Sequence, residues 1–387
     1  MPNMRRYITE YITKDLESKL VFITGPRQCG KTTLSKSLMS PYTYLNYDNS
    51  EDRQIILRKT WKQNSPLLIF DELHKLNKWK QWLKGIYDTQ DPFQPIVVTG
   101  SARLNTYRKA GDSLAGRFFQ FRLHPLDMRE IVLHTDSTQS RAQLFEQLWN
   151  CSPFPEPFLK GDPTYYRRWR TSHLDVILRQ DVQDLSAIRD IQQLETLLIL
   201  LRERIGSNIS VRSLAQDLQK DPNTIRKWLE ILEELYVIFK VTPYHRNIAR
   251  ALLKEPKYYF FDFCQVTDDG AKFENMVACA LLKHIHFIED TQGYHMNLHY
   301  TRTRDGKELD FVITKETQPI ALIEVKLSDD IPSSSFKTLS PFFKKTTPAI
   351  KCIQVVKNLT HRQDWPSDIT VIPAIEFLTS DLTELLK

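Results

Sequence analysis

The sequence predicts an α/β protein that contains two sheets separated by a helical region. Between residues 20 and 130, short continuous apolar runs alternate with helical patterns, which is typical of parallel strands covered on both faces. Between residues 257 and 375, two long apolar runs are joined by a turn and accompanied by a helical pattern. This second mixture of strands and helices predicts a separate α/β unit near the C-terminus.

The N-terminal region supplies the strands of the first sheet. A charged helix is expected over residues 1–19. The apolar runs that follow predict strands at 20–23, 44–47, 66–70, 95–99 and 118–123. The run at 66–70 ends in Asp71 and Glu72, and the run at 95–99 ends in Gly100 and Ser101.

The stretch VFITGPRQCGKTT, residues 21–33, carries the phosphate-binding pattern G-x-x-x-x-G-K-T between an apolar strand and a helix expected at 33–38. Its glycines let the backbone N–H groups surround a phosphate chain, and the helix N-terminus adds positive charge. Lys31 would neutralise the outer phosphates, and the Thr32 hydroxyl would ligate Mg²⁺. The pattern therefore predicts ATP and Mg²⁺ as cofactors, bound by Gly25, Pro26, Arg27, Gln28, Cys29, Gly30, Lys31, Thr32 and Thr33.

Four further residues are expected to take part in ATP hydrolysis. Asp71 would hold the Mg²⁺ shell, and Glu72 would polarise the attacking water. Ser101 is either a sensor that hydrogen-bonds the γ-phosphate or an ordinary turn serine. Arg117 stands at a loop tip before the strand at 118–123, so it is either a finger that reaches a neighbouring subunit's nucleotide or a surface arginine.

The middle of the chain reads as helical. A proline-rich stretch at 153–157 predicts a hinge or lid boundary, and residues 164–205 carry a helical apolar stripe. Residues 210–241 read as helix, tight turn, helix and strand, the pattern of a winged helix-turn-helix. Arg226 and Lys227 on the second helix would contact DNA, or the helix pair is a packing module that joins two domains.

The C-terminal strands are expected at 257–261, 285–288, 308–313 and 320–327, with a helix over 273–282. Glu324 and Lys326 are two residues apart on one strand, so both point to one face, where burying two charges is costly without a partner or a metal. Asp310 lies on the adjacent strand and Glu274 on the helix. Asp310 and Glu324 would ligate Mg²⁺, Glu274 would complete or orient the metal shell, and Lys326 would position the attacking water. The alternative is an ordinary pair of charges at a sheet edge in a vestigial site.

Two resemblances extend this interpretation. The motifs FITGPRQCGKTTL, LLIFDELHK, VVTGSARL and LAGRFFQFRLHPL, with YYFFDF, FENMV and ELDFVI…IEVK further on, resemble AAA-type ATPases of bacteria and archaea that carry a C-terminal domain of unknown function. Together these motifs cover most of residues 18–330. The resemblance implies a ring-forming, often hexameric ATPase with Arg117 as finger and Ser101 as sensor. The acid and acid-x-lysine hairpin resembles the core of PD-(D/E)xK nucleases.

The expected domain organisation follows from these patterns. A P-loop AAA-type ATPase domain occupies residues 1–150, a helical lid 151–209, a winged helix-turn-helix 210–250, and a PD-(D/E)xK, restriction-endonuclease-like domain 251–387. The net charge of +6 is compatible with nucleic acid. The five cysteines are too scattered for a zinc site, and neither a signal peptide nor an apolar run of membrane-spanning length is seen, so a cytoplasmic protein is expected.

The sequence thus predicts a homo-oligomeric ATP-hydrolysing motor that binds and remodels DNA and carries a Mg²⁺-dependent nuclease. Branched DNA, such as a Holliday junction, is the expected substrate by analogy with motor–nuclease systems. Two alternatives remain open at this point. The C-terminal domain is inert in a remodeller or regulator of DNA or protein, or the chain is a nucleotide-gated signalling switch that does not touch DNA.

Overall fold

The structure is a computed structural model that describes residues 4, 6–62, 65–90, 93–100, 114–134, 139–182, 190–245, 255–303 and 305–386. It divides into two compact units, Met1–Leu126 with Glu234–Tyr236, and Asp127–Glu233 with Val237–Lys387. The sequence placed the first boundary near residue 150. The first unit ends earlier because α5 (Met128–His134) and α6 (Arg141–Cys151) pack with α16 (Ala374–Thr379) of the second unit.

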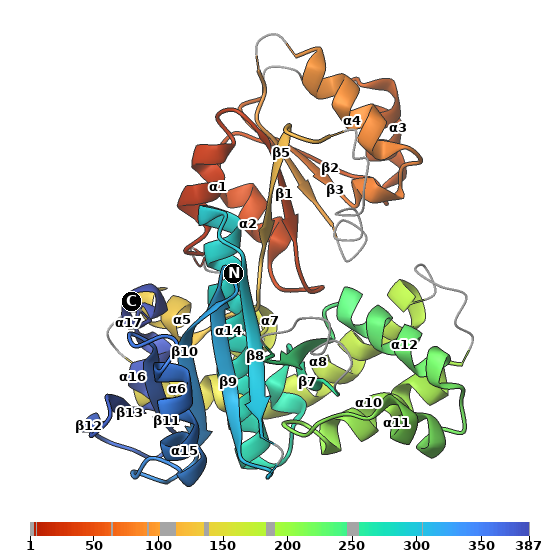
Figure 1. Cartoon of the computed structure of the whole chain (residues 1–387). Coiled ribbons are helices and arrows are strands. Elements are labelled where there is room, and N and C mark those ends of the chain that lie inside the picture. The colour runs from red at the N-terminus through yellow and green to blue at the C-terminus, as the bar shows by residue number, and fades with distance from the viewer. Residues whose placement is uncertain are drawn as a thin grey trace. The chain divides into compact units, whose positions relative to one another are not determined.

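The first unit is built on a five-stranded parallel sheet (Figure 1). In spatial order its strands are β2 (Thr43–Asn46), β3 (Leu68–Asp71), β4 (Ile96–Thr99), β1 (Leu20–Thr24) and β5 (Phe118–Arg122). Its helices are α1 (Thr9–Asp15), α2 (Lys31–Ser37), α3 (Ser50–Arg58) and α4 (Trp79–Asp88). The predicted parallel α/β arrangement of this region is confirmed.

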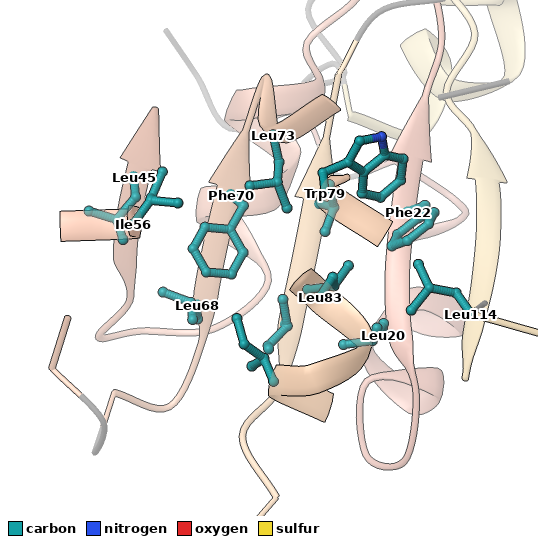
Figure 2. Close-up of a cluster of buried hydrophobic side chains, with 13 residues drawn as sticks. Leu20, Phe22, Leu45, Ile56, Leu68, Phe70, Leu73, Trp79, Leu83 and Leu114 are labelled. Carbon is teal, nitrogen blue, oxygen red and sulfur yellow. The ribbon is translucent and has the colours of Figure 1, made fainter. Parts of the chain in front are cut away.

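Alternate residues of these strands form an apolar cluster on one face of the sheet (Figure 2). Phe22 of β1 stacks on Phe118 with ring centroids 4.4 Å apart and meets Trp79 of α4 at 5.7 Å. Full burial of such a side chain contributes about 2 kcal/mol. The cluster therefore fixes β1, whose carboxyl end carries the phosphate-binding pattern. Its buried members are Leu20, Phe22, Leu45, Ile56, Leu68, Phe70, Leu73, Trp79, Leu83, Ile86, Ile96, Val98 and Leu114.

The second unit begins with helices. They are α5, α6, α7 (Pro155–Lys160), α8 (Pro163–Val176) with a π-helical turn at Ile177–Asp181, α10 (Ile191–Glu203), α11 (Val211–Asp217) and α12 (Pro222–Glu234). The proline-rich stretch opens α7, with Pro155 in its first turn, because proline suits the start of a helix. The expected helix pair is present as α11 and α12, and Arg226 and Lys227 are exposed on α12.

The second unit also holds an eight-stranded mixed sheet. In spatial order its strands are β12 (Gln363–Trp365), β13 (Ile369–Pro373), β11 (Lys351–Val356), β10 (Gln318–Lys326), β9 (Glu308–Lys315), β8 (Met296–Arg302), β6 (Ile238–Pro243) and β7 (Lys257–Phe260). The long helix α14 (Asp269–Gln292) packs on β7, β8 and β10, and α15 (Ser334–Lys344) packs on β9 and β10 (Figure 1). The chain ends in α16 and α17 (Leu382–Leu385). The strand after the helix pair, β6, thus pairs with β7 and β8 within this sheet.

One strand prediction is wrong. Residues 285–288, expected as a strand, lie inside α14. Leu281, Ile285 and Ile288 are buried at helical spacing along this helix. The short run Ile285–Ile288 resembles a strand only when it is read without the rest of the helix.

Within the described part of the chain, no helix is both long and apolar enough to cross a membrane.

Candidate functional site

The phosphate-binding loop runs between β1 and α2 and is closed by two glycines. Gly25 has φ +146°, and a Cβ built there would lie 2.1 Å from the carbonyl oxygen of Leu123, so no larger residue fits. Gly30 adopts a left-handed conformation with φ 99° directly before α2 begins at Lys31. The backbone therefore folds tightly against the N-terminus of the helix, as phosphate binding requires.

Side chains outside the sequence pattern anchor this loop. The buried Cys29 directs its Sγ toward the Leu123 carbonyl oxygen at 3.4 Å, so it acts as an anchor. Arg6, which the sequence did not single out, donates to the carbonyl oxygens of Cys29 (3.2 Å) and His124. Lys31 Nζ donates to the carbonyl oxygens of Gly25 at 3.0 Å and Pro26 at 2.6 Å.

The remaining predicted nucleotide-binding residues lie in the same segment. Arg27 is half-buried and Gln28 is exposed, and Gln28 has φ 62°, which helps the loop to turn. Thr32 and Thr33 lie in the first turn of α2. The structure therefore gathers all of the predicted nucleotide-binding residues around one helix N-terminus.

Asp71, at the end of β3, is the centre of a hydroxyl network. Its Oδ2 accepts hydrogen bonds from Thr32 Oγ1 (3.0 Å) and Tyr44 OH (2.7 Å), and its Oδ1 accepts one from Thr99 Oγ1 (2.6 Å). The strand register places Thr99 directly beside Asp71. Burial and the neighbouring Asp71 charge raise the pKa of Tyr44, so its phenol stays a donor. The hydroxyl and carboxylate at this position are hard oxygen donors that suit Mg²⁺, which completes its shell with water and substrate phosphates.

Glu72 follows in a left-handed conformation, φ 56° and ψ 24°, which costs roughly 1 kcal/mol and turns the chain at the end of β3. Its N–H donates to the Thr99 carbonyl oxygen at 3.0 Å. Its Oε2 lies 3.5 Å from His74 Nε2 and 4.0 Å from Lys75 Nζ. Burial, followed by the Asp71 charge, raises the pKa of Glu72 to about 7. A carboxylate with this pKa suits a general base near neutral pH.

ATP turnover should therefore depend on pH through Glu72. The carboxylate is protonated below pH 7 and ionised above it, so kcat/KM should fall about tenfold between pH 8 and pH 6. The profile is measured as steady-state phosphate release across this range. The residual activity of Glu72→Gln, assayed in the same buffers, corrects for the ionisation of ATP itself. A wild-type profile that is flat after this correction would contradict the assignment.

Of the two other residues expected in hydrolysis, the structure describes one, Arg117, and it does not lie at the loop. Ser101 lies outside the described residues. Arg117 precedes β5, and the register of Leu20 with Phe118 places it beside the start of β1, whereas the loop follows the end of β1. Five strand residues separate these ends by about 16 Å. Arg117 is instead held by Asp88 through two hydrogen bonds, from Nε to Oδ1 (2.7 Å) and from Nη2 to Oδ2 (3.1 Å).

The second candidate site lies on the larger sheet. Asp310 on β9 accepts a hydrogen bond from Val325 N at 2.8 Å, and Lys326 Nζ lies 2.9 Å from Glu324 Oε1 on β10. Burial first, and then the charges of Glu274 and Glu324, raise the pKa of Asp310 well above its usual value. The structure therefore brings all four predicted residues together. Glu324 is buried, and its Oε2 has no hydrogen-bond partner among the described residues.

A lysine that the sequence did not single out, Lys257 at the start of β7, lies within this carboxylate group. It is 1% exposed, and its Nζ lies 3.2 Å from Glu274 Oε1 and 2.5 Å from Glu308 Oε1. Burial alone would lower the pKa of Lys257, but the charges of Glu274, Asp310 and Glu308 outweigh it and the pKa is raised. Glu274 Oε1 also accepts a hydrogen bond from Tyr259 OH at 2.6 Å. This oxygen is therefore occupied, which makes Glu274 an orienting residue.

Replacing Lys257 with methionine should lower the free energy of unfolding by about 3–5 kcal/mol, because it leaves buried carboxylates without their counter-charge. Urea unfolding followed by circular dichroism measures the change. Lys351→Met, at an exposed position on the same sheet, should stay within about 0.5 kcal/mol of the wild type. A loss below 1 kcal/mol for Lys257→Met would show that the charges are not coupled as described.

The donor set limits the kind of metal site that is possible here. Among the residues that the structure describes, no group of three or more His, Cys, Asp or Glu side chains is arranged to hold a metal ion. Asp310 and Glu324 remain as two carboxylates, and Glu324 keeps one oxygen open. This arrangement fits Mg²⁺, which commonly takes one or two carboxylates and completes its shell with water and substrate phosphates.

Comparisons with known proteins cover most of the chain. An uncharacterized protein of Mycobacterium tuberculosis is 23% identical over 387 residues, covering 95% of this chain and 84% of the relative. Uncharacterized proteins of Haemophilus influenzae (21% identical, 87% of this chain and 89% of the relative) and Methanocaldococcus jannaschii (24%, 87% and 81%) are also similar.

A solved signal transduction ATPase with numerous domains, which has a tetratricopeptide repeat sensor and comes from Pyrococcus horikoshii, aligns with 12% identity and a TM-score of 0.27. The alignment covers 75% of this chain and 47% of that one, and a likeness at this level bears on neither fold nor function.

Residues 142–264 and 269–377 match families described as domains of unknown function, DUF8612 and DUF4143. Residues 17–132 match the family described as AAA domain, and this region is an AAA-type P-loop ATPase domain.

Proposed function

We propose that the chain is an ATP-hydrolysing motor that assembles into a hexameric ring, remodels DNA and cuts it with its C-terminal domain. The observation that carries the proposal is the pair Asp71–Glu72 at the end of β3. Asp71 is fixed by three hydroxyls, and Glu72 is ionisable near neutral pH. A merely nucleotide-binding loop would not need a carboxylate of this kind.

In this reaction, the backbone N–H groups of the loop and Lys31 bind the phosphates of ATP. Glu72 orients the attacking water and accepts its proton, and ADP and phosphate leave. Thr32 and Asp71 would hold Mg²⁺, which, when bound, neutralises charge on the β- and γ-phosphates. Tyr44 and Thr99 keep the Asp71 carboxylate in one orientation.

The position of Arg117 supports assembly into a ring. Arg117 lies at the end of the sheet where β1 and β5 begin, whereas its own nucleotide loop follows the opposite end of β1. It therefore cannot contact a nucleotide bound to that loop. In the proposed ring, this end of the sheet in one subunit would face the nucleotide of the next, and Arg117 would exchange Asp88 for the γ-phosphate. A guanidinium supplied from the neighbouring subunit would stabilise the transition state and couple the subunits.

The C-terminal site supports a phosphodiester-cutting step. Lys326 would position the attacking water and offset phosphate charge, and Asp310 and Glu324 supply oxygen ligands. Mg²⁺ held there would polarise the scissile phosphate. Arg226 and Lys227, exposed on α12, would contact DNA, and branched DNA such as a Holliday junction is the proposed substrate.

The test compares the wild type with Glu324→Ala and Lys326→Ala on linear, forked and four-way DNA in the presence of ATP and Mg²⁺. Both variants should lose DNA cleavage at least about a hundredfold and retain ATP turnover, because their side chains are far along the sequence from the ATPase domain. Asp330→Ala, an exposed acid just after β10, serves as the matched control. Cleavage that is equal in the wild type and both variants would refute the nuclease assignment.

A second candidate function has its own supporting observation. The Lys257 ammonium already pairs with Glu274 and Glu308, and its charge partly offsets the burial and the carboxylate charges that raise the pKa of Asp310. A lysine of the chain itself therefore balances part of the acidic charge. The chain would then be an ATP-dependent remodeller or regulator of DNA or protein with an inert C-terminal domain. DNA that the wild type binds but does not cut, at any Mg²⁺ concentration, would favour this function.

A further inference from the structure

Two lysines from different elements converge on one tryptophan ring. Trp149 of α6 is buried, and Lys272 Nζ and Lys357 Nζ lie 4.4 Å and 3.7 Å from its ring centroid. Phe145 stacks nearly parallel to the ring, at 15° with centroids 6.1 Å apart, and the Trp149 carbonyl oxygen lies 3.1 Å from Cys264 Sγ. The indole is therefore a fixed platform that holds both ammoniums.

The Trp149 ring and its two lysines adjoin the carboxylate site, which consists of Asp310, Glu324 and Lys326 with Glu274. Lys272 lies two residues before Glu274 on α14. Lys357 follows β11, and its N–H donates to the carbonyl oxygen of Lys326 at 3.0 Å. The start of α14 also approaches the residue after Lys326, since a Cβ at Gly270 would lie 3.9 Å from Leu327 Cδ1. Both lysines are thus next to the end of β10 that carries the site.

The charges of these lysines are not balanced within the described structure. Neither ammonium forms an ion pair with a carboxylate in the described ranges, although Lys257, Lys283 and Lys326 of the same unit all do. Two like charges held on one ring repel each other unless an anion lies between or beside them. Each contact with the ring contributes about 0.5–2 kcal/mol toward holding its ammonium in place. The arrangement is therefore preorganised to bind a polyanion.

We propose that Lys272, Lys357 and Trp149 form a clamp for the phosphodiester backbone of a DNA strand beside the carboxylate site. The inference rests on the proposed function, in which DNA reaches Asp310, Glu324 and Lys326. Lys272 and Lys357 each contact a phosphate that flanks the one to be cut. Trp149 is a positioning residue, which acts only by holding the two ammoniums.

The test measures DNA affinity by fluorescence anisotropy with labelled single-stranded, duplex and four-way DNA, using the full chain between 50 and 200 mM salt. Lys272→Ala/Lys357→Ala should weaken binding about tenfold at 100 mM salt and reduce the slope of log K against log salt by about two. Trp149→Leu should weaken binding by about threefold and keep the slope, because both charges remain. Lys315→Ala is the matched control, because Lys315 also lies over an aromatic ring, that of Tyr294, but at the far end of β9.

Each outcome separates the clamp from the wider proposal. DNA affinity and salt slope equal to the wild type in the double lysine variant would overturn the clamp and leave the proposed function standing. A reduced slope of log K against log salt in Trp149→Leu would overturn the positioning role of Trp149. A wild type that hydrolyses ATP but binds none of the DNA substrates would overturn the DNA function, and the clamp with it.

Discussion

Replacing Arg117 with alanine should lower the rate of ATP hydrolysis about a thousandfold and leave the affinity for ATP unchanged. Arg117 lies where β1 and β5 begin, at the opposite end of β1 from its own nucleotide loop, and it donates hydrogen bonds to Asp88. We therefore expect it to contribute nothing to nucleotide binding in the same subunit. In the proposed ring, the loss would arise when charge develops on the γ-phosphate bound to a neighbouring subunit. Saturating kcat and equilibrium binding of a fluorescent nucleotide separate the two effects.

Two variants distinguish a finger from a structural arginine. Asp88→Ala removes the partner in the same chain and should keep turnover at or above the wild-type rate, because Arg117 is released toward the nucleotide. Arg117→Lys keeps the charge but loses the two parallel N–H donors, so its turnover should stay well below wild type. A thousandfold loss of ATP affinity in Arg117→Ala would contradict the finger role. Equal losses of ATP turnover in Asp88→Ala and Arg117→Ala would also contradict it, because the ion pair would then stabilise the fold instead.

Replacing Glu72 with glutamine should abolish hydrolysis, with kcat reduced at least about a hundredfold, while the protein retains bound ATP. Glutamine has the same shape, so the left-handed backbone at this position and the N–H bond to Thr99 are preserved. Only the proton acceptor is lost. Nucleotide recovered from the purified variant after incubation with ATP and Mg²⁺ should be ATP, whereas the wild type should yield ADP.

The matched control for Glu72 is Asp48→Asn. Asp48 is bound to Lys75 at 2.6 Å, and Lys75 also lies 4.0 Å from Glu72. Removing the Asp48 charge disturbs the same lysine and takes away the smallest of the charges that act on the pKa of Glu72, but it leaves the Glu72 carboxylate itself in place. At pH 8, where Glu72 is ionised in both proteins, turnover should therefore remain within about twofold of wild type. Turnover in Glu72→Gln that equals the wild type would exclude Glu72 as the residue that activates water.

The parts of the fold that the sequence predicted correctly depend on short-range patterns. The strands around Phe22, Phe70 and Val98 are continuous apolar runs, and the glycine loop is defined by spacing within a few residues. Such features are readable because each strand and loop carries its own signal. The strand prediction at 285–288 was wrong because it also relied on a short run. Four residues cannot show the helical period that the whole of α14 shows.

The residues that the sequence did not reveal act across long separations in the chain. Tyr44 and Thr99 meet Asp71 only because three parallel strands end at one edge of the sheet. Arg6 reaches the loop from the lead-in segment, and Lys257 reaches Glu274 from a strand that reads as apolar. A lysine directly before the apolar run Tyr258–Phe261 was the available signal, because burying an unpaired ammonium is costly and implies a partner.

The most direct test of the shared ATPase site is to mix Arg117→Ala with Glu72→Gln. Each variant alone should be nearly inactive. At an interface where the Arg117→Ala subunit supplies Glu72 and the Glu72→Gln subunit supplies Arg117, a complete site forms. An equal mixture should therefore recover up to about a quarter of the wild-type ATP turnover, since one in four random interfaces has both groups. Turnover in the mixture that does not exceed the sum of the two variants would contradict a site built from two subunits.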